Sequence, residues 1–200
     1  MLSGKVQFPE RVKLALEDEI NGFERTFNRL LSCFDNIESE AAEKRQNFLD
    51  RKSKSFNPDR DDEACIEEDG YFIELNHVFI ETTLKQEYIN SIAVSLFHLF
   101  ERQKKRIFYS AETDEIKRKV DRSCYNIDSC PHWKTLNEGL RDSANCVKHG
   151  LDSDSGKKLQ SKYPLLFENG CIVLKKSDIE RYLAALRYFW DKLLNGRVVL

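Results

Sequence analysis

The sequence predicts an all-α protein, built as a four- to five-helix bundle that contains two long antiparallel helices. Apolar residues recur every three or four positions over two long stretches, which is the spacing of one face of an amphipathic helix. Gly and Pro are scarce, at eight and four residues, and this disfavours hairpin-rich β architectures. Charged residues make up 33% of the chain, with both signs interspersed, as expected for helices with solvated outer faces. We expect a single domain over residues 1–200.

The first long helix is predicted from about residue 9 to about residue 51, with a bend near residues 35–36. Pro9 suits its first turn, where the missing N–H does no harm. Residues 52–69 break the periodicity, are polar and charged, and contain Asn57-Pro58, so we expect a flexible loop there. The apolar stripe of this helix consists of Val12, Leu16, Ile20, Phe23, Phe27, Leu30, Phe34, Ile37 and Ala41.

A second long helix is predicted over residues 71–108, and one loop between two such helices favours an antiparallel hairpin. His98 lies within this run, and we interpret it as a packed core residue rather than as a catalyst. The basic end of the helix, residues 101–106, is favoured by the helix dipole. The apolar face consists of Phe72, Leu75, Phe79, Ile89, Ile92, Leu96, Leu99 and Phe100.

The rest of the chain is also expected to be mainly helical. A short charged helix is predicted at residues 111–122. The third main helix begins after Ser129, which we expect to cap it, has Pro131 in its first turn and stops at Gly150. The remaining elements are a polar loop at 152–158, a short turn at 159–167, an extended segment at 171–174 and a last helix that Ser177 and Glu180 begin as a capping box.

Composition argues against several classes of protein. A pI near 6.1 disfavours a protein that coats nucleic acid through bulk charge, whereas an enzyme that contacts RNA at one site fits. No signal peptide is recognised and no run approaches the roughly 18 apolar residues of a membrane helix, so we expect a cytoplasmic protein without membrane contact. Six scattered cysteines predict reduced thiols, mostly in the core. Cys124, Cys130 and His132 match no zinc spacing, so neither a metal nor a cofactor is expected.

The third main helix carries the residues with the clearest chemistry. Projected at about 100° per residue, one polar face consists of Arg141, Asn145, Lys148 and His149. Such groups are able to bind a phosphate and to move protons near it. A simpler interpretation is the polar face of any surface helix, with Glu138 paired to Arg141 at helical spacing. The core face consists of Trp133, Leu136, Leu140, Ala144 and Val147.

This helix ends in the string Ala144-Asn145-Cys146-Val147-Lys148-His149-Gly150. The string resembles the helix-terminal Asn-x-x-Lys-His-Gly signature found in some members of the HEPN superfamily. The layout is similar too, with two long helices, a motif helix, a polar loop, a Leu-x-x-x-Tyr-Pro-Leu-Leu-Phe stretch and an apolar closing helix. The resemblance covers the whole chain in layout and about ten positions at residue level.

The resemblance implies a single HEPN-like helical domain that acts as a metal-independent endoribonuclease of a toxin–antitoxin or anti-phage system, with its active site across a homodimer. By this resemblance His149 is the acid–base group, Arg141 the phosphate-binding cation and Asn145 the polar orienter. Lys148 assists in binding the substrate. The RNA 2′-OH attacks the adjacent phosphate, which needs proton transfer and charge stabilisation but no metal. The chain departs from the compact form of the motif, because Ala144 stands where an arginine would directly precede the asparagine.

Two other interpretations stay open. A catalytically inactive HEPN-like module that binds a nucleotide or a partner protein would have Arg141 salt-bridged to Glu138 and His149 exposed. An all-α interaction protein unrelated to the HEPN superfamily would place this polar face in open solvent. The ribonuclease predicts instead that the face is concave or buried against a second copy.

Overall fold

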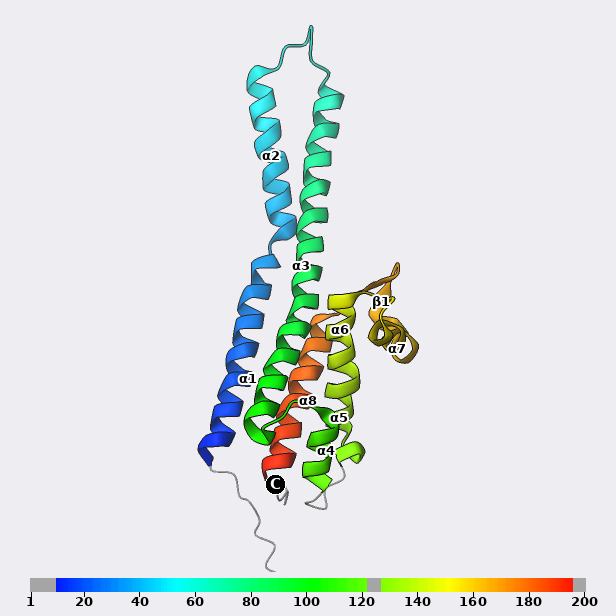
Figure 1. The fold of residues 1–200 in the computed structure, drawn as a ribbon. Coiled ribbons are helices and arrows are strands. Elements are labelled where there is room, and N and C mark those ends of the chain that lie inside the picture. The colour runs from blue at the N-terminus through cyan, green and yellow to red at the C-terminus, as the bar shows by residue number, and fades with distance from the viewer. Residues whose placement is uncertain (1–9, 122–126, 196–200) are drawn as a thin grey trace, which may run out of the picture. The chain divides into compact units, whose positions relative to one another are not determined.

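The computed structural model describes residues 10–121 and 127–195, which are almost entirely helical, with one two-stranded sheet (Figure 1). The predicted all-α class is therefore confirmed. The expected helix start at Pro9 and the thiol of Cys124 lie outside the described residues. Among the residues that are described, no helix combines the length and the apolar character needed to cross a membrane.

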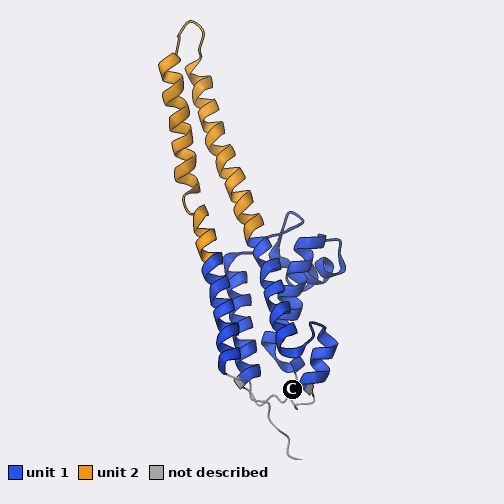
Figure 2. Cartoon of the chain, turned by 60° about the vertical axis from the view of Figure 1, so that its left-hand side comes forward, with its two compact units in different colours: residues 1–27, 89–200 blue, residues 28–88 orange. Residues whose placement is uncertain are grey.

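The chain divides into two compact units (Figure 2). One consists of residues 1–27 and 89–200, and the other of residues 28–88. Helices α1 (Glu10–Leu31) and α3 (Glu63–Phe108) each contribute residues to both units. The single domain over residues 1–200 stays a prediction.

The bend predicted in the first long helix is confirmed. After α1, a 3-10 turn covers Ser32–Phe34, and α2 (Ile37–Ser55) begins three residues later. Asn36 occupies the position before α2, and its carbonyl accepts a hydrogen bond from the N–H of Glu40 at 2.9 Å. Asp and Asn favour such breaks because their side chains compete with the helical backbone for hydrogen bonds.

In the unit of residues 28–88, α2 and α3 form the predicted antiparallel hairpin. Near the connector, Leu49 lies so close to Gly70 that a Cβ added to the glycine would stand 3.1 Å from the leucine Cδ2. Further from the connector, Lys44 Nζ lies 2.9 Å from His77 Nδ1. Earlier residues of α2 thus meet later residues of α3, as an antiparallel pair requires.

The connector of this hairpin is shorter than the sequence suggested. The loop expected over residues 52–69 is wrong at both ends, because only residues 56–62 are non-helical. Asp62 Oδ1 accepts a hydrogen bond from the N–H of Ala64 at 2.9 Å and thereby caps α3. The acidic run that follows belongs to the helix, where Glu67 Oε2 lies 3.1 Å from an arginine of α2.

Part of the predicted apolar face of α3 is not a core face. Phe72, Leu75 and Phe79 are 68%, 51% and 69% exposed. The side of α3 that meets α2 carries Gly70 and His77 instead. Apolar spacing identifies one face of a helix, but it does not identify what that face meets.

The unit of residues 1–27 and 89–200 contains the remaining elements. The short strands pair antiparallel, with Phe167 opposite Ile172, and the predicted extended segment is confirmed over its first two residues. In chain order these elements are α4 (Thr113–Asp121), a 3-10 turn (Ile127–Ser129), α5 (Pro131–Lys134), a π-helical turn (Thr135–Leu140), α6 (Arg141–His149), α7 (Asp154–Lys162), a 3-10 turn (Pro164–Leu166), β1 (Phe167–Glu168), β2 (Cys171–Ile172) and α8 (Lys176–Asn195).

Two helix caps in this unit differ from those predicted. Ser129 does not cap α5, because the residue after it occupies the N-cap position and makes no side-chain hydrogen bond there. The prediction that Ser177 and Glu180 form a capping box is also wrong. Instead the Asp178 carboxylate accepts a hydrogen bond from the N–H of Lys175 at 2.9 Å, at the start of α8. A carboxylate near a helix N-terminus is favoured by the helix dipole.

An aromatic cluster at the centre of this unit fixes the position of the motif helix. The ring of Phe100 in α3 lies edge-on to Phe189 of α8 at 5.7 Å and to Trp133 of α5 at 6.3 Å between centroids. Trp190 completes the cluster, and its Nε1 donates to Gln103 Oε1 at 2.7 Å. Aromatic packing therefore joins α5 to both α3 and α8.

Candidate functional site

The motif helix is one helical run over residues 131–149, in which the π-helical turn separates α5 from α6. A π-helical turn holds one more residue than an α-helical turn, and such turns occur often at functional sites. Gly139 lets this turn lie against α8, because an added Cβ would stand 3.1 Å from Tyr182 Cε1. The run begins with Pro131 and ends before Gly150, whose φ of 81° suits glycine, as predicted.

The core side of α6 anchors the helix to α8. Ser143 Oγ lies 3.0 Å from Tyr182 Oη, and both residues are buried. Ala144 is fully buried as well. An arginine at this position would place an unpaired charge in the core, at a cost on the order of several kcal/mol. The arginine of the compact motif therefore has no accessible place at position 144 of this chain.

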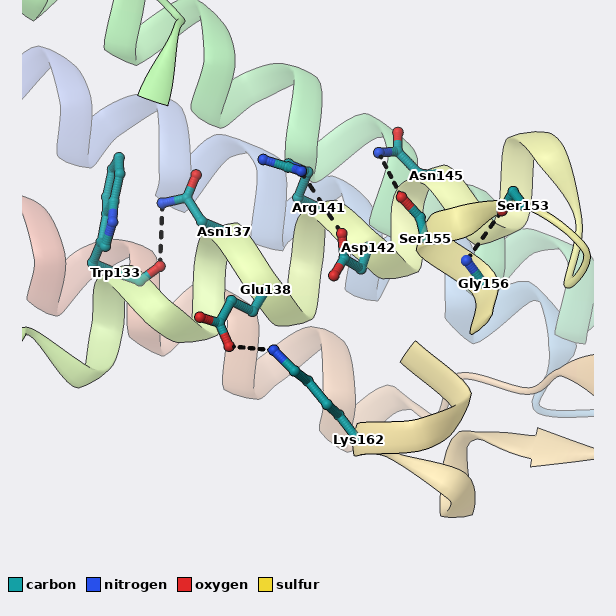
Figure 3. Close-up of polar contacts among 10 residues, drawn as sticks. All are labelled: Trp133, Asn137, Glu138, Arg141, Asp142, Asn145, Ser153, Ser155, Gly156 and Lys162. Atoms are coloured by element: carbon teal, nitrogen blue, oxygen red, sulfur yellow. Dashed lines mark hydrogen bonds and ion pairs between the residues drawn. The ribbon is translucent and has the colours of Figure 1, made fainter. Parts of the chain in front are cut away.

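Three polar residues follow one another along one side of the helix. Figure 3 shows Asn137, Arg141 and Asn145 on this side and Glu138 on the other. Asn137 is buried, and its Oδ1 has no hydrogen-bond partner among the described residues. Asn145 Nδ2 donates to Ser155 Oγ of α7 at 3.4 Å. The structure thus brings Arg141 and Asn145 to one side of the helix and adds Asn137, which sequence reasoning missed.

The two remaining predicted residues, Lys148 and His149, lie at the end of α6 and are exposed. His149 follows Arg141 by eight residues, which is about 12 Å along an α-helix axis. It does not line the cavity that Arg141 lines. Within one chain, the helical spacing therefore separates the imidazole from the guanidinium.

Arg141 borders a surface cavity of about 400 Å³. Its side chain is 42% exposed, and Asp142, 3.8 Å from its Nε, is its only carboxylate within 4.0 Å among the described residues. Burial is the main reason that the pKa of the Asp142 carboxyl is raised, while Arg141 opposes this shift. Glu138 Oε2 pairs with Lys162 Nζ at 2.8 Å, so the predicted salt bridge between Arg141 and Glu138 is wrong. The guanidinium is left free to bind an anion.

Lys104 of α3 lines the same cavity and is almost fully buried, with 2% of its surface exposed. Its Nζ donates to the carbonyl of Ala111 at 3.3 Å and lies 4.7 Å from the ring centroid of Phe100. Burial lowers the pKa of Lys104 to about 8, Glu101 partly opposes this, and Arg141 lowers it further. A second cation therefore stands beside the predicted phosphate-binding residue.

Sequence reasoning missed Lys104 and misjudged His98, both on α3. The helix dipole by itself favours a basic helix end, so the run of basic residues does not distinguish Lys104 from its neighbours. Lys104 follows Phe97 by seven residues and Phe100 by four, a spacing that places it on the buried face. His98 was expected in the core, but it is exposed, and its Nδ1 lies 3.3 Å from Glu101 Oε2.

Helix α7 follows the motif helix where a polar loop was expected over residues 152–158. Ser153 Oγ accepts a hydrogen bond from the N–H of Gly156 at 3.1 Å and caps α7. A Cβ added to Gly156 would stand 2.5 Å from the carbonyl oxygen of Leu151 and 2.7 Å from that of Gly150. Only glycine therefore lets α7 start directly against the end of α6.

Gly156→Ala is expected to lower the free energy of unfolding by about 1–3 kcal/mol, because the methyl group overlaps main-chain oxygens that cannot turn aside. The matched control is Gly22→Ala in α1, where the nearest atom is 4.0 Å away at the end of the flexible Arg25 side chain. Since alanine is the better helix former, this control is expected to leave stability unchanged or to raise it by up to about 1 kcal/mol. Urea unfolding followed by circular dichroism measures both. A Gly156→Ala protein as stable as the wild type would contradict the close approach.

No protein-family model matches the sequence, and neither the curated proteins nor the solved structures give a significant match. The resemblance to the HEPN superfamily therefore stays a prediction. The described part of the chain contains no group of three or more His, Cys, Asp or Glu side chains placed to hold a metal ion. Among the described cysteines, Cys130 and Cys146 are buried, but Cys33, Cys65 and Cys171 are exposed, so the expectation that most of the six thiols lie in the core is wrong.

Proposed function

We propose that the chain is a HEPN-like, metal-independent endoribonuclease that acts as a homodimer in the cytoplasm. The observation that carries the proposal is the placement of Arg141 and His149, four residues before and four residues after Asn145 on the accessible part of α6. If a two-fold axis passes beside Asn145, two antiparallel α6 helices set Arg141 of one copy opposite His149 of the other. The separation of the two groups within one chain then becomes proximity between chains.

Each side chain has one role in this arrangement. Arg141 binds the reacting phosphate, with Lys148 as a further cation, and the Asn145 amide orients the phosphate. His149 transfers protons while the RNA 2′-OH attacks the adjacent phosphorus and the bond to the 5′ oxygen breaks. The cations stabilise the charge that develops on the phosphate. A place in a toxin–antitoxin or anti-phage system, under the control of an antitoxin or other partner protein, is part of the same proposal.

Cleavage of a fluorescent RNA in the presence of EDTA tests this proposal. His149→Ala is expected to lower the rate about 100- to 10,000-fold, which is the usual contribution of general acid–base catalysis. Arg141→Ala is expected to lower the rate strongly as well, because the phosphate charge loses its partner. The matched control is His98→Ala, which removes an exposed histidine of α3 outside the site. This variant protein should cleave RNA at the wild-type rate. Equal residual cleavage by every protein, all folded by circular dichroism, would reveal a contaminating nuclease and end the proposal.

A second candidate function is a catalytically inactive HEPN-like module that binds a nucleotide or a partner protein. One observation favours it: Arg141 lines its cavity together with Lys104, whereas His149 does not line that cavity. RNA that is bound but left intact by the wild-type protein would favour this candidate. A strictly monomeric mass in light scattering would contradict an active site that is shared between two copies.

A further inference from the structure

We propose that Lys104 and Arg141 together form one phosphate-binding site, in which Lys104 is a second cation for the phosphate that Arg141 binds. Both cations line one cavity of about 400 Å³, which is within the range of small-molecule sites, roughly 300–1,000 Å³. The inference deepens the proposed ribonuclease, and the choice of phosphate as the anion rests on that proposed function. The presence of an anion site rests on the two cations alone.

The ammonium group of Lys104 is buried without a direct ion pair to any of the described residues. Its Nζ donates to one carbonyl, that of Ala111, and faces the ring of Phe100. Among the described residues, no carboxylate lies within the 4.0 Å of an ion pair with this ammonium group. Lysine is almost never fully buried without a charged partner, because removing an ammonium group from water is unfavourable. A phosphate in the cavity would supply the missing counter-charge to Lys104 and would meet the Arg141 guanidinium at the same time.

Carboxylates at the cavity restrict where an anion is able to bind. Glu112 and Asp114 are exposed, so water screens their charges. Glu101 Oε2 lies 3.3 Å from His98 Nδ1, and its negative charge raises the pKa of Lys104, against the effect of burial. Lys104 is buried, and charges interact more strongly where water is excluded. The favourable position for a phosphate is therefore the inner end of the cavity, next to Lys104 and Arg141.

The affinity for phosphate is expected to fall as the pH rises above about 8, because Lys104 binds an anion only when it is protonated. Burial sets its pKa at about 8, against the opposing effect of Glu101 and with further lowering by Arg141 and Lys105. The other charged groups at the cavity are the carboxylates of Glu101, Glu112 and Asp114 and the guanidinium of Arg141. A phosphate monoester is already a dianion above about pH 6. Above pH 8 the affinity should drop by up to about tenfold per pH unit.

Calorimetric titration of the full chain with adenosine monophosphate and with adenosine tests the site. The protein carries His149→Ala, so that the cleavage reaction plays no part. The monophosphate is expected to bind and adenosine is not, while Lys104→Met and Arg141→Met each weaken binding at least about tenfold. The matched control is Lys119→Met, because Lys119 Nζ also donates to a carbonyl at the end of α3, that of Phe108 at 2.6 Å, but does not line the cavity. Lys104→Arg should keep binding and lose the fall above pH 8, since arginine stays charged.

Two results would overturn this site: equal binding of adenosine and its monophosphate, or equal affinities of Lys104→Met and Lys119→Met. If Lys104→Met does not fold, an unchanged pH dependence in Lys104→Arg overturns the site instead. RNA cleavage without nucleotide binding would reject the site and keep the ribonuclease, whereas nucleotide binding without cleavage would do the reverse. Preference for a 5′-phosphorylated RNA over the same RNA with a 5′-hydroxyl would identify an RNA end as the source of the phosphate.

Discussion

Mixing the His149→Ala and Arg141→Ala proteins in equal amounts is expected to restore about a quarter of the wild-type RNA cleavage rate, although neither protein cleaves alone. In the proposed dimer, each active site takes Arg141 from one copy and His149 from the other. A mixed dimer therefore has one site with both residues intact and one site that lacks both. Random exchange makes about half of the dimers mixed, and half of the sites in these are intact.

This mixing experiment separates a shared site from a site within one chain. If both residues acted within one chain, each copy in the mixture would lack one of them and the mixture would stay inactive. The rates of the mixture and of each parent are compared after incubation long enough for subunits to exchange. Mixing His149→Ala with a protein that carries both substitutions is the control, because no dimer in that mixture has an intact site.

Phe100→Ala is expected to lower the free energy of unfolding by about 3–5 kcal/mol, the usual cost of removing a buried aromatic ring. Phe100 is fully buried, and its ring makes edge contacts with Trp133, Phe189 and Trp190. Its removal leaves a cavity between α3, α5 and α8 that rigid neighbours fill only in part. Urea unfolding followed by tryptophan fluorescence is a direct measurement, because Trp133 and Trp190 both line that cavity.

Leu165→Ala is the control for this substitution. Leu165 belongs to the same unit but is 89% exposed, so its truncation should change stability by no more than about 0.5 kcal/mol. A loss below about 1 kcal/mol in Phe100→Ala would show that the aromatic cluster does not hold the motif helix in place.

The class and the order of the long helices were predictable because apolar spacing and helix breakers are local features of the sequence. The break at residues 35–36, Pro131 at a helix start and Gly150 at a helix end all follow from single-residue backbone preferences. The predicted connector is too long because the acidic residues that begin α3 have the composition of a loop. Their partner, an arginine of α2, is distant in sequence, and ion pairs between helices leave no local pattern.

The candidate site was predictable only in part. The projection of α6 correctly groups Arg141 with Asn145, since both stand in one α-helix. It could not reveal Lys104, which comes from another helix, nor the pairing of Glu138 with Lys162 of α7. The exposure of side chains on α3 was not predictable either. Phe79 and Phe100 have the same chemistry and lie on the same helix, yet Phe79 is 69% exposed and Phe100 is fully buried.

The additional residue in the π-helical turn at residues 135–140 determines the direction in which the side chains of α6 point around the helix axis. Shortening this turn by one position would rotate the side chains of α6 by about 100° around the helix axis. Trp133 lies before the turn and would stay among its aromatic neighbours, while Arg141 would swing away from Lys104. A homologue that lacks the additional residue would thus share the bundle without placing an arginine of this helix at the cavity that Lys104 lines.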